Sequence, residues 1–72
     1  MEKSFQIIIG SPVDYEELVA YIWIDGEEVA LVQKEEGVDR MKVEFFEEKI
    51  NINIYYDVFI EALKEAKKEL MK

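Results

Sequence analysis

The side chains that could do chemistry in this 72-residue chain are mostly carboxylates, because it contains no Cys and no His. The thiol nucleophile and the commonest general base are therefore both missing. A pair of carboxylates can hydrolyse a glycosidic bond, and Glu28, Glu44 and their neighbours could supply such a pair. That reaction also needs a cleft that excludes water, and so small a domain has little room for one. We therefore expect no catalytic residues and a protein that is not an enzyme.

No motif for a cofactor or a metal ion accompanies these acids. The chain has no glycine-rich phosphate loop, and Asp25-Gly26 lacks the acids at every second preceding position that a Ca²⁺ loop requires. Asp14, Glu16 and Glu17 could hold no more than a weak divalent cation. We expect no cofactor and no metal site.

The acids are grouped, and each group falls where the apolar pattern breaks for a turn. Four Glu-Glu pairs occur, at residues 16–17, 27–28, 35–36 and 47–48. Of the net charge of −8, residues 1–54 carry all of it, with 13 acids and 5 bases, while residues 55–72 hold 4 of each. Binding to nucleic acid or to an anionic membrane depends on Lys and Arg, so the sequence predicts neither.

Short apolar segments predict strands at the start of the chain. Residues 5–9 (FQIII) are typical of a strand, and the turn formers at residues 10–12 close it. The next stretch has two interpretations. Ser11 before Pro12, followed by helical apolar spacing, would begin a helix. The hairpin signal downstream instead favours a strand over residues 18–24, with residues 12–17 forming a turn or a single helical turn.

That hairpin signal is Asp25-Gly26, because a type I′ turn needs positive φ at both central positions. Two further turns, at Gly37 and at Glu47-Glu48, would continue an antiparallel meander and end in a strand over residues 50–54. All three turns keep one apolar face in register. The predicted pairs on that face are Ile22 with Val29, Ala20 with Leu31, Leu31 with Val43, and Val43 with Ile52.

The apolar period changes to that of a helix after residue 54. An apolar stripe that includes Phe59, Leu63 and Leu70 predicts an amphipathic helix of about 17 residues from about Tyr55, with Asn53 as its N-cap. Together these elements predict a single α+β domain over residues 1–72. It is a small antiparallel meander of four to five strands with one C-terminal amphipathic helix packed on one face.

This topology predicts two surfaces that could bind a partner. The acidic turns gather at the two ends of the sheet: Asp14, Glu16, Glu17, Glu35, Glu36 and Asp39 at one end, and Asp25, Glu27, Glu28, Glu47 and Glu48 at the other. The face opposite the helix carries Val19, Tyr21, Trp23, Val32 and Phe46, together with Ile8 and Ala30. The acids serve either solubility or attraction to a basic partner. The apolar face is either an interface or is covered by Tyr15 and the N-terminal segment.

We therefore expect a non-enzymatic acidic module for protein–protein interaction, of the inhibitor, immunity or anti-defence kind, which binds a basic, nucleic-acid-binding partner. The alternative is a homodimeric structural or scaffold domain whose acids serve only solubility. No apolar run approaches the roughly 20 residues of a membrane span, and no basic segment with a following apolar stretch begins the chain. The expected location is cytoplasmic.

Overall fold

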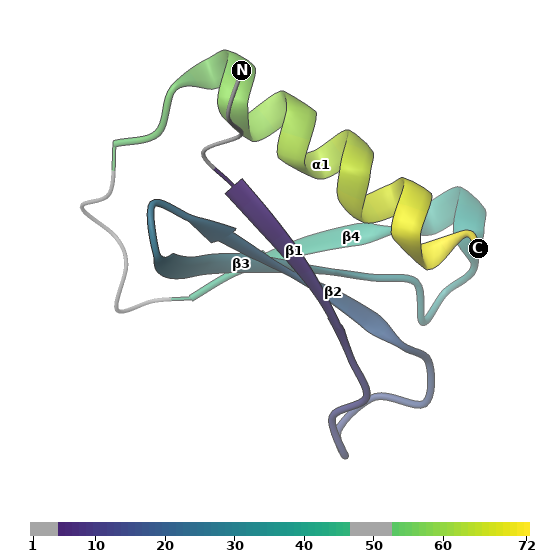
Figure 1. Cartoon of the computed structure of the whole chain (residues 1–72). Helices are drawn as coiled ribbons and strands as arrows, with labels where there is room; N and C mark the ends of the chain where they lie inside the picture. The colour runs from purple at the N-terminus through teal and green to yellow at the C-terminus, as the bar shows by residue number, and fades with distance from the viewer. Residues whose placement is uncertain (1–4, 47–52) are drawn as a thin grey trace.

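The computed structural model of the chain describes residues 5–46 and 53–72. It has an α+β fold, in which four antiparallel strands in the order β1-β2-β3-β4 carry one C-terminal helix on one face (Figure 1). The fold class is as predicted. The elements are β1 (Phe5–Gly10), β2 (Val19–Ile24), β3 (Glu27–Gln33), the short 3-10 helix η1 (Val38–Arg40), β4 (Lys42–Phe45) and α1 (Tyr56–Leu70).

The turn between β2 and β3 is the one that the sequence predicts. Asp25 and Gly26 have φ angles of 54° and 83°, the positive values that a type I′ turn requires. Ile24 pairs with Glu27 next to the turn, and Trp23 pairs with Glu28.

A β-bulge then shifts the register of β3 by one residue. The shift lies between Ile22 and Trp23, so that Ile22 pairs with Ala30, and Val29 is the extra residue. The predicted pairing of Ile22 with Val29 is therefore wrong.

This shift exchanges the two faces of the rest of β3, because successive side chains of a strand point to opposite faces. Ala20 pairs with Val32 instead of Leu31, and Val32 pairs with Val43 on β4. Val32 lies in the core and is only 4% exposed, so its predicted place on the helix-free face is wrong. The same correction moves Ala30 into the core and Leu31 to the helix-free face.

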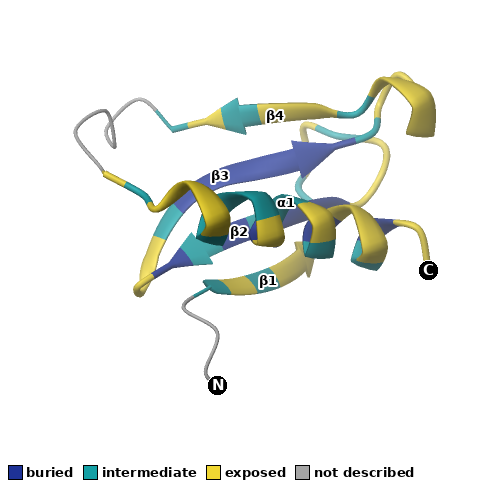
Figure 2. Cartoon of the chain, turned by 90° about the horizontal axis from the view of Figure 1, so that it is seen from above, coloured by how far each residue is buried: buried dark blue, intermediate teal, exposed yellow. Residues whose placement is uncertain are grey.

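The core lies between α1 and the face of the sheet that α1 covers. The helix packs mainly on β1 and β2, touches β3, and leaves β4 largely uncovered (Figure 2). The small side chains of Ala62 and Ala66 are fully buried against the sheet, and Phe59 and Leu63 pack at the border of this core, as the apolar stripe predicts. The core cluster is formed by Ala20, Ile22, Ile24, Val29, Ala30, Val32, Ala62, Ala66 and Leu70.

The two ends of α1 carry charges that suit the helix dipole, but the predicted N-cap is wrong. Tyr55 is the N-cap and no side chain caps it, so the prediction of Asn53 is wrong. Asp57 lies in the first turn and Lys67 and Lys68 lie in the last, which places each charge near the complementary end of the helix dipole. In the described residues, no helix is long and apolar enough to cross a membrane.

The structure decides between the two interpretations of residues 11–18. They form a loop, in which the Tyr15 N–H donates to the Pro12 carbonyl at 3.2 Å, so the favoured turn is confirmed and the alternative helix is wrong. The predicted turn at Glu47 and Glu48 and residues 50–52 of the predicted last strand lie outside the described residues. Residues 53–54 belong to no strand, which contradicts the prediction there.

We expect Ile22→Ala to lower the free energy of unfolding by about 2 to 5 kcal/mol, because Ile22 is fully buried. Ile22→Val, which leaves a smaller cavity, should cost about 0.5 to 1.5 kcal/mol and serves if the alanine variant does not fold. Ile9→Ala is the matched control, since Ile9 lies on the same face of the sheet but is 38% exposed. Urea titration would measure all three, and equal losses for Ile22→Ala and Ile9→Ala would contradict the assigned core.

Candidate functional site

Glu35 joins the two loops that lie at one end of the sheet. Its carboxylate accepts hydrogen bonds from the backbone N–H groups of Glu16, at 3.1 Å, and of Glu17, at 2.7 Å. The β1–β2 loop and the β3–β4 loop therefore meet, as the topology predicts. The Glu35 carboxylate thus joins the two loops, and both of its oxygens already accept a hydrogen bond within the chain.

Glu36 is also occupied, because two basic side chains neutralise it. Arg40 Nε lies 3.2 Å from one of its carboxylate oxygens and Lys42 Nζ lies 2.5 Å from the other. The hydrogen bond to Glu36 raises the pKa of Lys42. Four other carboxylates at this end, those of Asp14, Glu16, Glu17 and Asp39, form no hydrogen bond or ion pair with another described residue. The acids predicted at this end thus form two groups. Glu35 and Glu36 are structural, because they bond within the chain, and the other four are available to a partner.

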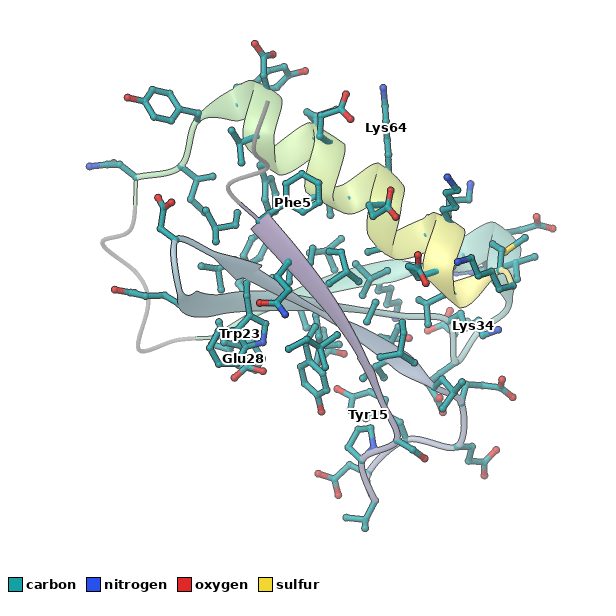
Figure 3. All side chains as sticks on the ribbon, viewed as in Figure 1. Phe5, Tyr15, Trp23, Glu28, Lys34 and Lys64 are labelled. Atoms are coloured by element: carbon teal, nitrogen blue, oxygen red, sulfur yellow. The ribbon has the colours of Figure 1, made fainter. Side chains whose placement is uncertain are left out.

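The opposite end of the sheet carries Asp25 on the tight turn and Glu27 and Glu28 at the start of β3. Glu47 and Glu48, which the prediction also places here, lie outside the described residues. Glu28 is half-buried and lies on the helix-free face beside Trp23, to which it is paired across the two strands (Figure 3). Its carboxylate forms no hydrogen bond or ion pair with the part of the chain that the structure describes.

The helix-free face keeps most of the predicted apolar side chains, but they differ in exposure. Trp23 and Tyr21 are half-buried on β2, and Ile8 beside Tyr21 on β1 is 40% exposed. Phe46, just after β4, is half-buried. Val19 lies on this side of the sheet but is fully buried, so it is not available to a partner.

Tyr15 links the β1–β2 loop to β4 on the side of the sheet away from α1 (Figure 3). Its hydroxyl donates to Glu44 Oε1 at 2.6 Å, and Glu44 pairs with Leu31 on the helix-free face. Gln33 Nε2 donates to the other oxygen of Glu44 at 3.0 Å, and Gln33 Oε1 accepts from the Glu35 N–H at 3.0 Å. Tyr15 therefore lies at the end of the helix-free face where Val19 pairs with Gln33, whereas Trp23 lies at the other end.

This network shifts the proton equilibria of two groups. The hydrogen bond to Glu44, with smaller contributions from burial and from the charges of Glu44 and Asp14, raises the pKa of Tyr15 to about 12. The hydrogen bonds from Tyr15 and Gln33 hold the pKa of Glu44 below its ordinary value. Both shifts favour the charged carboxylate beside the neutral phenol.

Tyr21 is held in place by a close approach to β1. A Cβ atom added to Gly10 would lie 2.7 Å from Cε2 of Tyr21, so the ring lies directly against the Gly10 backbone. Tyr21 therefore leans toward β1, and any larger residue at position 10 would displace it. Trp23, two residues further along β2, is flanked by Gln6 on β1 and Glu28 on β3.

The contacts of Tyr15, Gln33 and Glu44 were not predicted from the sequence. The sequence held one sign that the predicted register of β3 was wrong. With Val29 and Leu31 on the helix-covered face, that register also places Gln33 there. A polar amide on such a face costs free energy unless it is hydrogen-bonded, so its position pointed to a register error.

The described part of the chain also has one shallow hollow. The described residues that line it are Asn53, Ile54 and Tyr55, and none of these three is a carboxylate or an amine. Within residues 5–46 and 53–72, no group of three acidic side chains is close enough together to hold a metal ion. No known protein family, curated protein or solved structure gives a match to this chain.

We expect Tyr15→Phe to lower the free energy of unfolding at neutral pH by about 1 kcal/mol, the usual value of one hydrogen bond. Because the pKa of Glu44 is lower in the folded state, this stabilisation is present above pH 4.5 and is lost as the pH falls through the folded pKa. The difference between wild type and Tyr15→Phe should therefore shrink in acid.

The alkaline side gives a second check on the same contact. The pKa of Tyr15 rises from 10.0 to about 12 on folding, so its contribution is complete below pH 10 and declines as the pH rises toward 12. Urea titrations across this pH range would measure both limbs. Tyr21→Phe is the control, because the Tyr21 hydroxyl forms no hydrogen bond within residues 5–46 and 53–72. A Tyr15→Phe difference that stays constant from neutral pH into acid would refute the assignment.

Proposed function

We propose that this protein is a non-enzymatic interaction module that binds a basic protein partner through the Trp23 end of the helix-free face. One observation carries the proposal. Trp23 and Glu28 are paired on this face, both are half-exposed, and within residues 5–46 and 53–72 the Glu28 carboxylate forms no hydrogen bond or ion pair. An aromatic ring beside an available carboxylate suits a Lys or Arg side chain, which can stack on the ring and pair with the acid.

The charge distribution supports a basic partner over a neutral one. The helix segment, residues 55–72, is balanced, so the net charge of −8 belongs to residues 1–54. Complementary potentials of this kind raise the rate at which two proteins meet. The available acids Asp14, Glu16, Glu17 and Asp39 contribute to attraction from the far end, while Trp23 supplies the apolar contact that typically dominates affinity.

The class of partner follows from the same chemistry. A protein that binds nucleic acid presents Lys and Arg to the phosphates, and a compact acidic protein can occupy those same cationic groups. The protein would then act as an inhibitor, immunity or anti-defence factor. Self-association through the aromatic face is less favoured, since it would bring Asp25 and Glu28 of two negatively charged copies together.

Trp23 is the only Trp in the chain, so its fluorescence reports directly on this site. We expect an oligoarginine peptide to change the Trp23 emission in a saturable way, with an affinity that falls as salt rises from about 50 to 300 mM. Glu28→Gln should weaken this binding about five- to tenfold, as loss of one charged hydrogen bond does.

Glu61→Gln is the matched control, because it removes the same charge from the exposed side of α1. It should change the affinity by no more than about twofold, as a surface charge screened by salt does. Equal effects of the two variants would mean that only net charge matters and would contradict the site. No saturable binding of the peptide would contradict the proposed function.

A further inference from the structure

Strand β1 is an open edge of the sheet. The sheet order begins with β1, which pairs on one side with β2, and residues 6–10 have no other described strand beside them (Figure 2). Alternate backbone N–H and C=O groups of an edge strand point away from the sheet. Such a row of donors and acceptors can pair with another strand.

This edge lacks the devices that normally prevent such pairing. Its sequence, FQIIIG, contains no charged residue and no Pro, and its ladder with β2 shows no register shift. Natural edge strands are commonly protected by Lys, by Pro, by a bulge or by being very short. The opposite edge, β4, is such a strand, with four residues that include Lys42 and Glu44.

The side chains of β1 are apolar and exposed on both faces. Ile8, on the helix-free face, is 40% exposed, and Ile9, on the helix-covered face, is 38% exposed. A strand placed against β1 would cover part of both. A domain of this size buries little surface alone, so added burial would contribute substantially to its stability.

We propose that β1 pairs in an antiparallel manner with β1 of a second copy, so that two four-stranded sheets become one continuous sheet across a two-fold axis. An antiparallel edge is complementary to itself under such an axis. Residues paired across the two copies must point to the same face, and faces alternate along a strand. The two-fold axis therefore passes through a residue and not between two, and near the middle of β1 that residue is Ile7 or Ile8. Because β1 is uncharged, nothing in it attracts the basic partner proposed above, whereas a second neutral β1 matches it.

The charges at the two ends of β1 predict an unusual salt dependence. The Asp25 turn follows Ile24, which pairs with Phe5, and the acidic loop of Asp14 follows Gly10. Antiparallel pairing sets the Asp25 turn of one copy beside the acidic loop of the other. Like charges repel less when salt screens them, so the dimer should become tighter as salt rises. A complex with a basic partner should become weaker, which separates the two proposals.

Sedimentation velocity and hydrogen exchange on the wild-type protein would test the pairing. We expect a monomer–dimer equilibrium that shifts toward dimer with concentration and with salt. In the dimer, the outward-facing amides of β1, which alternate along residues 6–10, should exchange at least about tenfold more slowly than in the monomer. A dimer in which these alternate amides remain unprotected would overturn the proposal, as would a protein that stays monomeric to about 1 mM.

A pair of variants at one position separates edge pairing from folding. Ile8→Lys places two ammonium groups near each other between the copies and should weaken the dimer at least tenfold. Ile8→Thr keeps a β-branched, uncharged side chain and should retain most of the dimer. Circular dichroism would show whether each variant is folded. A folded Ile8→Lys variant with an unchanged dimer would overturn the proposal, and if that variant does not fold, the wild-type exchange pattern decides.

Discussion

The bulge at Val29 is the constraint on which the rest of the structure depends. One extra residue in β3 sends Val32 into the core and turns Gln33 toward the helix-free face. In the unshifted register Gln33 would lie against the core, where an unbonded amide costs about 1 to 3 kcal/mol. With the bulge, Gln33 meets Glu44 and Glu35. The packing of the sheet and the polar contacts across its end thus have one common origin.

The acids of this protein fall into two functional groups that composition alone does not distinguish. Glu35, Glu36 and Glu44 hold loops and strands together through hydrogen bonds and ion pairs within the chain. Glu28 lies beside Trp23, and its carboxylate bonds to no other side chain among the described residues. At the end of the sheet that holds Glu35 and Glu36, structural carboxylates lie among available ones, whereas at the Trp23 end Glu28 forms no such contact with a described residue.

Much of the fold follows from local signals, whereas the register of β3 does not. Asp25-Gly26 has one favourable turn geometry, and the apolar stripe of α1 has one helical period, so both were predictable. Residues 29–32 are four consecutive apolar residues, VALV, and either register places apolar side chains on both faces. Alternation cannot choose between two such registers. The contacts of Tyr15 with Glu44 depend on that choice, so they were beyond the sequence as well.

The hydrogen bonds from Glu16 and Glu17 to Glu35 divide the β1–β2 loop into an anchored half and a free tip. Val13, in the tip, is 99% exposed. Closing a longer loop costs little additional entropy, about 0.6 kcal/mol for each doubling of its length. Extra residues added beside Val13 would open the turn that the Tyr15 N–H closes on the Pro12 carbonyl, but they would leave the two bonds to Glu35 in place. The same insertion between Tyr15 and Glu17 would break that anchor, so the tip is the better place in this loop for an epitope or a tether.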